Sequence, residues 1–457
     1  MRDNDTIVAI ATPVGVGSVG VVRLSGTESL TIAQKLWRPV TKDEKRHSHR
    51  VSLGWVVREG TKIDQALLIY MRGPHSYTGE DVIEIQAHGS QVVLNQIADL
   101  AIAAGARLAE PGEFTKRAYL NGKIDLVQAE AVGELISSTN QKMTELASQQ
   151  LAGSVSTKTD QLALEIARIA ARESANLDFS EEDLGGTDPE QLKRELSEIK
   201  HDIQRLLEGE DQLSVIRDGF KVALVGLPNA GKSSLLNYVL GHDRSIVTSQ
   251  AGTTRDTIEE AITIQSLLVR LVDTAGLRSG AGKVEAIGVE RAIKELQTAG
   301  LILLLVEPGK LAATDKLMRD MGMSSKALRG KVVVVHTKSD KHHSSEKVQK
   351  SIDDLPSLTI STKTGEGVEQ LKETIYRQGV RQTSEIGTQL TTKRQYEVLH
   401  RALDGVEDAL QAAESAMPTD IIVAALQQSL GDLLRLSGKQ ASEETIAAIF
   451  SGFCIGK

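Results

Sequence analysis

The sequence predicts a multidomain α/β plus α chain, in which a helical domain is interrupted by an inserted α/β domain. A complete phosphate-binding loop at residues 226–233 lies between an apolar strand and a helix start. Helical periodicity occurs on both sides of this loop, and strand patterns with glycine turns occupy the first part of the chain. We therefore expect an N-terminal α/β domain over residues 1–121, a helical segment over 122–213, the inserted domain over 214–381 and a second helical segment over 382–457.

Composition narrows the classes of protein that this chain can form. Its 457 residues predict about three domains. It has 53 Lys and Arg against 61 Asp and Glu, and the net charge of −8 argues against a broadly basic nucleic-acid-binding surface. No apolar run approaches the roughly 18–20 residues of a membrane span, and the first residues lack the apolar core of a signal peptide. One cysteine, Cys454, excludes an internal disulfide and predicts a cytoplasmic protein.

The first 121 residues show the pattern of a mixed α/β domain. Strands are expected at residues 7–11, 20–24 and 82–86, because β-branched and apolar residues alternate there between glycine-rich turns.

Apolar residues then recur at helical spacing on both sides of the inserted domain. We expect these residues to pack in the core of one discontinuous helical domain, and any motion of the inserted domain would then reach the helices through two connections. The stripe before the insertion is Leu192, Leu196, Ile199, Ile203 and Leu206, and the stripe after it is Ile421, Ile422, Ala425, Leu426, Leu430, Leu433, Leu434 and Ser437.

The phosphate-binding loop follows the apolar strand 222–225, and a helix follows the loop. In such a loop the backbone N–H groups point at the phosphates, and the helix N-terminus adds partial positive charge. Lys232 is expected to reach the outer phosphates and Ser233 to ligate Mg²⁺. The predicted phosphate-binding residues are Asn229, Ala230, Gly231, Lys232, Ser233 and Ser234.

Two segments after this loop are typical of nucleotide hydrolysis. Asp273, Thr274, Ala275 and Gly276 directly follow the apolar strand 267–272. An aspartate in this position holds Mg²⁺ through water, and the glycine N–H contacts the γ-phosphate. Thr254 resembles the switch threonine that ligates Mg²⁺ in the triphosphate state.

Two later loops predict that the bound base is guanine. The strand 332–335 leads into Thr337, Lys338, Ser339 and Asp340, which resemble a guanine-reading loop whose aspartate accepts two hydrogen bonds from the base. The strand 358–360 leads into a backing loop. With the earlier motifs, these loops resemble a translation-factor-type GTPase, so the inserted domain is predicted to be a Ras-like P-loop GTPase domain. Thr337 stands where asparagine is usual, and we expect weaker affinity without a change of base. The predicted base-contacting residues are Thr337, Lys338, Asp340, Ser361, Thr362 and Lys363.

The way in which this domain hydrolyses GTP is indicated by two positions. Leu277 occupies the place where Ras-like proteins carry a water-orienting glutamine, so another group must position the water. Asn229 resembles the asparagine of potassium-activated GTPases, in which K⁺ takes the electrostatic role of an arginine, worth roughly 10³–10⁵ in rate. The predicted K⁺ ligands are Asn229, Thr248, Gln250 and Thr253.

Both ends of the chain carry further motifs. The chain ends in Phe-Cys-Ile-Gly-Lys at 453–457, and the N-terminal part contains five short motifs. Together they resemble the tRNA modification GTPase family MnmE, also called TrmE, and the resemblance spans the whole chain. The five N-terminal motifs lie at residues 5–9, 20–26, 77–81, 111–115 and 121–126.

The resemblance implies that the N-terminal domain mediates homodimerisation and binds a 5-formyl- or methylene-tetrahydrofolate. By matching motif positions, Arg23, Glu80, Lys123 and Lys457 line the folate site. Cationic side chains suit the glutamate tail of a folate, and a carboxylate suits the N–H groups of its pterin ring. Cys454 is either a nucleophile or redox participant, or a small residue packed near the folate.

The resemblance also implies a reaction and its partners. Glu285 aligns with the family's water-orienting glutamate, so the predicted catalytic residues are Glu285, Lys232 and Asn229. The family works with a flavoprotein, MnmG (GidA), and installs an aminomethyl or carboxymethylaminomethyl group on carbon 5 of the wobble uridine of certain tRNAs. Hydrolysis of GTP would drive opening and closing of the complex.

Two other functions compete with this interpretation. A potassium-dependent ribosome-assembly GTPase explains the inserted domain equally well, but it leaves both chain ends unexplained. A free-standing folate aminomethyltransferase with a GTPase regulator would form product from folate and tRNA without a flavoprotein.

Overall fold

The computed structural model describes residues 5–41, 47–138, 140–178, 188–243, 259–265, 267–273, 293–323, 326–341, 352, 355–383 and 390–457. The chain divides into two compact units. The second unit interrupts the first, because the chain leaves the first unit and later returns to it. The first unit comprises residues 1–137, 147–205 and 389–457, and the second comprises 138–146 and 206–388.

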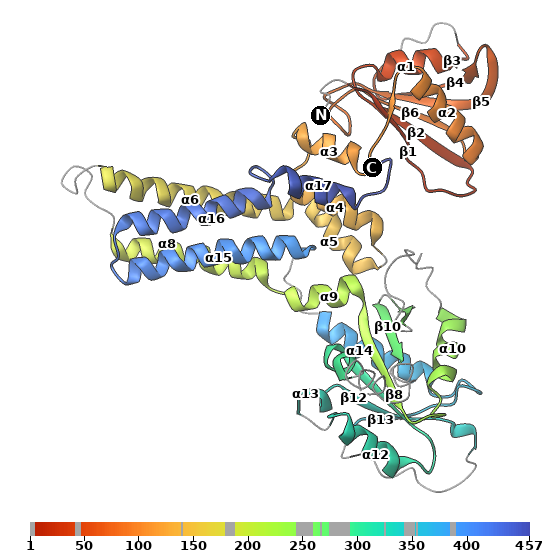
Figure 1. Ribbon diagram of the computed structural model, residues 1–457, viewed down its shortest axis with the longest axis vertical. Helices are drawn as coiled ribbons and strands as arrows, with labels where there is room; N and C mark the ends of the chain where they lie inside the picture. Colours follow the sequence, from red (N-terminus) through yellow and green to blue (C-terminus); the bar gives the residue numbers. More distant parts are fainter. Residues whose placement is uncertain are drawn as a thin grey trace, which may run out of the picture. The chain divides into compact units, whose positions relative to one another are not determined.

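A seven-stranded sheet forms the N-terminal part of the first unit (Figure 1). The strand order is β3-β4-β5-β6-β2-β1-β7, and neighbouring strands are antiparallel except for the β1–β7 pair. The strands predicted near residues 7, 20 and 82 are confirmed as β1, β2 and β6. The strands are β1 (Ile7–Ile10), β2 (Val19–Ser25), β3 (Trp37–Pro39), β4 (Arg50–Arg58), β5 (Thr61–Met71), β6 (Val82–His88) and β7 (Arg107–Leu108).

Two helices, α1 (Ser29–Leu36) and α2 (Gln91–Ala103), pack against one face of this sheet (Figure 1). Their buried Ile32 and Ile97 join strand residues such as Leu24 and Ile85 in one hydrophobic core. Successive side chains of a strand point to opposite faces, so Arg23 and Glu84 lie on the face away from this core. That opposite face carries the polar residues of the candidate site.

The helical part of the first unit comes from both sides of the insertion. Helix α16 packs against α15 and α6, and ion pairs join α8 to α6 (Arg172–Glu195, 2.7 Å) and to α15 (Lys200–Glu407, 2.9 Å). Short helix α3 (Glu113–Leu120) precedes this bundle in the sequence, and the residues of α5 (Gln141–Leu151) are divided between the two units. The remaining helices are α4 (Leu126–Ser137), α6 (Ser154–Asp178), α8 (Pro189–Leu207), α15 (Lys393–Glu414), α16 (Thr419–Leu436) and α17 (Glu443–Ser451).

The first predicted apolar stripe is buried along α8 at all five positions. The second is correct in part, because Ile422, Leu426 and Leu433 are buried in α16, whereas Ile421 is 45% exposed. Neighbouring residues of a helix are rotated by about 100°, so Ile421 lies beside the buried face rather than on it.

The end of the chain returns to the N-terminal part of the first unit. The Tyr119 hydroxyl donates to the Gly438 carbonyl at 2.6 Å, and the tilted rings of Phe450 and Phe453 lie 5.5 Å apart between centroids. The last residues then hydrogen-bond to the start of α3, where the Phe114 N–H donates to the Lys457 carbonyl at 3.2 Å. These contacts carry Lys457 to the candidate site.

The second unit has a six-stranded sheet in the order β13-β12-β11-β8-β10-β9, parallel except for the antiparallel β9. Alternate residues of β8 enter two cores, Val222 and Leu224 on one face and Ala223 and Val225 on the other. A parallel sheet buried on both faces is typical of α/β domains. The strands are β8 (Phe220–Gly226), β9 (Glu259–Ile264), β10 (Leu267–Asp273), β11 (Leu301–Val306), β12 (Val332–His336) and β13 (Ser357–Thr359).

The helices of this unit come before, between and after its strands in the sequence. The helix expected after the phosphate-binding loop is α10, which begins at Lys232, two residues before the predicted start. Within the described part of the chain, no helix combines the length and apolar character needed to cross a membrane. The helices are α9 (Glu210–Asp218), α10 (Lys232–Asp243), α12 (Leu311–Asp320), α13 (Lys326–Arg329), α14 (Val368–Thr383) and the 3₁₀ helix η2 (Ser339–Lys341).

Candidate functional site

The phosphate-binding loop joins β8 to α10. Its turn uses two residues in the left-handed region, Asn229 at φ +65° and Gly231 at φ +96°. Lys232 is 7% exposed, and its Nζ donates to the carbonyls of Gly226 at 2.8 Å and Leu227 at 3.0 Å. These bonds hold the ammonium group across the loop, where a positive charge can neutralise phosphate oxygens.

The predicted base-reading loop after β12 is hydrogen-bonded to the phosphate-binding loop. The buried Thr337 hydroxyl donates to the Ala230 carbonyl at 2.9 Å. Lys338 Nζ donates to the Asn229 carbonyl at 2.9 Å and pairs with Glu307 at 2.5 Å. Thr337 therefore supplies a donor to the phosphate-binding loop, although asparagine is more usual at this position.

Asp340 and Ser361 come together from the two predicted base-reading loops. The fully buried Ser361 hydroxyl donates to Asp340 Oδ1 at 2.8 Å, and the N–H of Lys363 donates to the same hydroxyl at 3.3 Å. The hydrogen bond from Ser361 holds the pKa of Asp340 below its usual value, with help from the charges of Lys363 and Lys341. Thr362 lies between Ser361 and Lys363 in this loop. The carboxylate is thus fixed as an acceptor.

Two predicted Mg²⁺-binding residues lie at one edge of the second sheet. Asp273 ends β10 in register with Leu224 of the parallel β8, and Ser233 lies in the first turn of α10, which follows β8. Hydroxyl and carboxylate oxygens are ligands that suit Mg²⁺, so these residues fit the ion. Other predicted metal, phosphate and catalytic residues fall outside the described residues: Thr248, Gln250, Thr253, Thr254, Thr274, Ala275, Gly276 and Glu285.

Arg23 and Lys457 are brought together on the N-terminal sheet. The Arg23 guanidinium pairs with Glu84 at 2.8 Å, donates to the Gly456 carbonyl at 3.4 Å, and lies 5.6 Å from the ring centres of Tyr77 and Phe114. Burial, together with the charge of Arg23, lowers the pKa of Lys457, and Glu84 partly opposes this effect. The Arg23 guanidinium beside two aromatic rings, with the second cation of Lys457 nearby, suits an anionic ligand with an apolar body.

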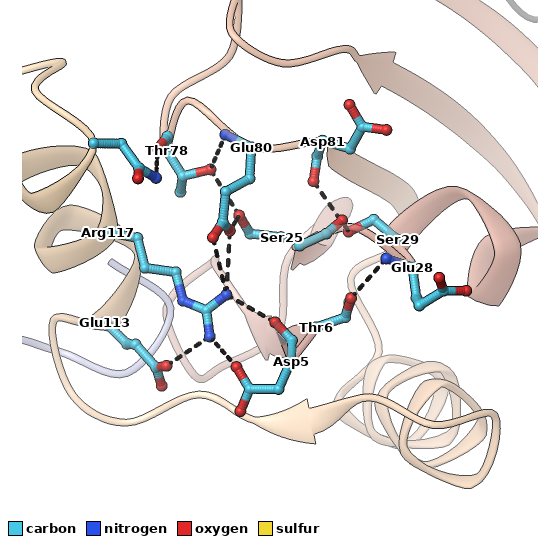
Figure 2. Close-up of polar contacts among 12 residues, drawn as sticks. Asp5, Thr6, Ser25, Glu28, Ser29, Thr78, Glu80, Asp81, Glu113 and Arg117 are labelled. Atoms are coloured by element: carbon cyan, nitrogen blue, oxygen red, sulfur yellow. Dashed lines mark hydrogen bonds and ion pairs between the residues drawn. The ribbon is translucent and has the colours of Figure 1, made fainter. Parts of the chain in front are cut away.

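Glu80 lies on the loop between β5 and β6, in the polar cluster shown in Figure 2. Its carboxylate accepts hydrogen bonds from Ser25 at 2.7 Å and from Arg117 at 3.1 Å. Lys123, the fourth predicted folate residue, donates to the Pro74 carbonyl at 2.9 Å on the same loop. Tyr77 of this loop also contacts Arg23, so the loop at 73–81 carries Glu80 and contacts Arg23 and Lys123.

The sequence interpretation missed Arg117 and Glu84. Arg117 follows Glu113 by four residues on α3, and this spacing is a recognisable signal for an ion pair, here 3.0 Å long. Its contacts with Asp5 and Glu80 depend on the tertiary fold, so no local pattern could have predicted them.

These features define a P-loop GTPase domain, inserted into a helical domain that follows an α/β N-terminal domain. The family model described as the GTP-binding protein TrmE N-terminus matches residues 6–123, and the MnmE helical domain model matches residues 126–454. The chain belongs to the MnmE family of tRNA modification GTPases and is a GTP hydrolase.

Relatives match along almost their whole length. The tRNA modification GTPase MnmE of Lactobacillus gasseri is 36% identical, covering 99% of this chain and 98% of the relative. The protein of that name from Natranaerobius thermophilus is 37% identical, covering 99% of each chain. The one from Staphylococcus haemolyticus is 37% identical over all of both chains. The family predicted from the sequence is therefore confirmed.

Proposed function

We propose that this chain is the GTP-hydrolysing component of a complex that modifies tRNA wobble uridines. The complex installs an aminomethyl or carboxymethylaminomethyl group on carbon 5, with the carbon taken from a tetrahydrofolate. The observation that supports this proposal best is the docking of the C-terminal residues beside Arg23, because a folate-binding role would explain why cationic side chains from both ends of the chain, Arg23 and Lys457, lie close together.

A 5-formyl- or methylene-tetrahydrofolate suits the residues of the N-terminal site. Arg23 and Lys457 would bind its anionic tail, and Glu80 would accept hydrogen bonds from the N–H groups of its pterin ring. Lys123 would hold the loop at 73–81 through the Pro74 carbonyl. The folate would supply the one-carbon unit, while these side chains bind and orient it. Cys454 is exposed close to Lys457, which is compatible with either of its proposed roles.

In the second unit, Lys232 and the phosphate-binding loop would hold the GTP phosphates, and Asp340 would read guanine. Ser233, Thr254 and Asp273 are proposed to hold Mg²⁺, with Asp273 acting through water. Asn229 is exposed, and its backbone lies in the left-handed region of the turn. We propose that it binds K⁺ together with Thr248, Gln250 and Thr253. Glu285 is proposed to orient the attacking water.

The partners are proposals of the same kind. A second copy of this chain would pair through the N-terminal domain, and apolar side chains exposed on β4 and β5 (Val51, Leu53 and Leu67) support such an interface. The flavoprotein MnmG would supply the hydride, and tRNA would be the substrate. The net charge of −8 favours a partner that makes much of the tRNA contact.

The test is mass spectrometry of tRNA nucleosides from cells that lack this protein. Complementation with the intact chain should restore carbon-5 aminomethyl uridines, and complementation with a chain lacking Lys457 should not. Lys439→Gln is a matched control, because Lys439 is also near the C-terminus but pairs with Asp160 on the helical bundle. Unchanged nucleosides in the deletion strain would exclude the proposed reaction and direct attention to ribosomal particles.

A further inference from the structure

A buried guanidinium lies directly behind the proposed pterin-binding carboxylate. Arg117 has a side chain only 12% exposed, and it pairs with Glu80 at 3.1 Å, Asp5 at 2.6 Å and Glu113 at 3.0 Å (Figure 2). A charged group this far from solvent needs such partners, because removing a charge from water without compensation is costly. Arg117 has three such partners, and Glu80 is the one that we propose contacts a ligand.

Arg117 is held in place independently of Glu80. Arg107 bridges the other two carboxylates, bonding Asp5 at 2.7 Å and Glu113 at 2.7 Å. Burial by itself would raise the pKa of Glu113, but hydrogen bonds from Arg107, the Glu110 N–H and Arg117 hold it below the usual value. The order of charges is thus Arg107, then Asp5 and Glu113, then Arg117, then Glu80, which is the most exposed of the three carboxylates.

Glu80 receives donors from two different elements. The fully buried Ser25 hydroxyl reaches its Oε2 from β2, and the Arg117 guanidinium reaches both carboxylate oxygens from α3. A carboxylate has about four acceptor positions, so these bonds fix its orientation and leave capacity on the open side. The side chain of Glu80 is 27% exposed, which gives a ligand access to that side.

The loop that carries Glu80 is fixed at other points. The Asn121 side chain donates to the Thr78 carbonyl at 2.7 Å, and Asp81 accepts from the Gly73 N–H at 2.9 Å and from the Tyr70 hydroxyl at 3.0 Å. Because the backbone is held by these bonds, Arg117 acts chiefly on the direction of the Glu80 carboxylate.

We propose that Arg117 is a positioning residue that aims the Glu80 carboxylate at two adjacent N–H groups of the pterin ring. This inference rests on the proposed folate-binding function. A carboxylate held as an acceptor by donors behind it favours a ring with a 2-amino group beside a ring N–H. The site should therefore reject an analogue that lacks the 2-amino group, since one carboxylate oxygen would lose its partner.

Calorimetric titration of the full-length chain with 5-formyl-tetrahydrofolate tests this proposal. Arg117→Gln should weaken binding about tenfold to a hundredfold, the range for loss of charged hydrogen bonds. Arg107→Gln is the matched control, because it removes a guanidinium from the same ion-pair cluster without touching Glu80. Its affinity should stay within about twofold of wild type, because the side chain of Arg107 bonds to Asp5, Glu113 and Leu108 rather than to Glu80.

A double-mutant cycle separates positioning from general destabilisation. In a Glu80→Gln background, Arg117→Gln should cause little further loss, because its effect passes through that carboxylate. The wild-type preference for the 2-amino ring over its 2-desamino analogue should shrink in Arg117→Gln. Arg117→Lys, which keeps a charge without the planar fork, should show an intermediate loss and provides a second variant if Arg117→Gln does not fold.

Equal losses in Arg117→Gln and Arg107→Gln, or losses that add in the cycle, would overturn the role of Arg117 while leaving folate binding intact. An absence of binding by the wild-type chain would instead overturn the proposed folate function, and the positioning role with it.

Discussion

Glu80 in the N-terminal domain and Asp340 in the GTPase domain are both carboxylates that we propose accept hydrogen bonds from a heterocycle. Each is held by a serine hydroxyl, from Ser25 at 2.7 Å for Glu80 and from Ser361 at 2.8 Å for Asp340. Glu80 is also held by the guanidinium of Arg117. Both serine bonds go to a charged carboxylate, so the additional bond from the positively charged Arg117 is what orients Glu80 more firmly.

The difference follows from where the two residues lie. Asp340 is placed by the end of β12, and its partner Ser361 follows the neighbouring strand β13. Adjacent parallel strands bring their carboxyl ends to one edge, so regular structure positions both groups. Glu80 lies on a loop between antiparallel strands and depends on partners from β2 and α3. The side chain of a loop residue needs side-chain partners to be positioned as precisely as one that follows the end of a strand.

The largest effect is expected when Asp340 loses its charge. Asp340→Asn should lower GTP affinity about a thousandfold, because two charge-assisted hydrogen bonds to the base are lost at roughly 1.5–3 kcal/mol each. An asparagine amide can donate to the extra carbonyl of xanthine, so XTP should bind better than GTP. Titration with both nucleotides measures this change. A variant that still prefers GTP would remove Asp340 from base recognition.

The bond from Thr337 to the phosphate-binding loop gives the next largest effect. Thr337→Val keeps the shape of the side chain but removes the donor to the Ala230 carbonyl, at a cost of about 1–3 kcal/mol in the free energy of unfolding. GTP affinity should fall with it, because the loop is less well ordered. Thr337→Ser keeps a hydroxyl and is the control. Denaturant unfolding that gives equal stability for the valine and serine variants would contradict this role.

Removing the serine hydroxyl at each site, with Ser361→Ala and Ser25→Ala, compares the two carboxylates directly. Ser361→Ala should raise the pKa of Asp340, because the hydrogen bond that lowers it is lost, and should weaken GTP binding about fivefold, or roughly 1 kcal/mol. Ser25→Ala should weaken folate binding less, about twofold, because Arg117 still holds Glu80. Carboxyl NMR titration and the two dissociation constants give the result. A larger loss in Ser25→Ala would reverse the proposed order of the two sites.

The smallest effect concerns pH. Burial and the charge of Arg23 lower the pKa of Lys457, so the folded chain binds this proton less tightly than the unfolded chain does. Its contribution to the free energy of unfolding therefore rises with pH between the lowered pKa and the ordinary value. Binding of an anionic folate should weaken as pH rises through the lowered pKa, because neutral lysine cannot pair with a carboxylate.

Glu84→Gln sharpens this pH test. Glu84 raises the pKa of Lys457, so its removal should move the loss of folate affinity to lower pH. A chain without Lys457 is the control and should lack this step. An unchanged pH profile in Glu84→Gln would show that Lys457 does not titrate in this range.

Local sequence patterns predicted most of the GTPase sheet, because strand ends, glycine loops and apolar runs are local signals. They could not predict that Thr337 donates to Ala230, since this contact joins two loops that are distant in sequence. For Ile421, helical spacing was read correctly, but the direction of the buried face depended on how α16 packs against its neighbours. The boundaries of the four predicted segments stay predictions.

The N-terminal site was predicted only through the family resemblance. Single charges such as Arg23 and Lys123 carry no local signal that separates a ligand-binding residue from an ordinary surface charge. The fold brings Lys457 to Arg23 from the opposite end of the chain, and no spacing rule predicts such a contact. The proposed switch residues and Glu285 lie outside the described residues and stay predictions.

We propose that one chain holds two separate carboxylates, Asp340 and Glu80, that each accept hydrogen bonds from a different heterocycle. The most direct test measures the dissociation constants of GTP and 5-formyl-tetrahydrofolate for wild type, Asp340→Asn and Glu80→Gln. We expect a crossed result, in which Asp340→Asn loses GTP binding and keeps folate binding, and Glu80→Gln loses folate binding and keeps GTP binding. If Glu80→Gln binds the folate as tightly as wild type does, Glu80 has no part in recognising the pterin ring.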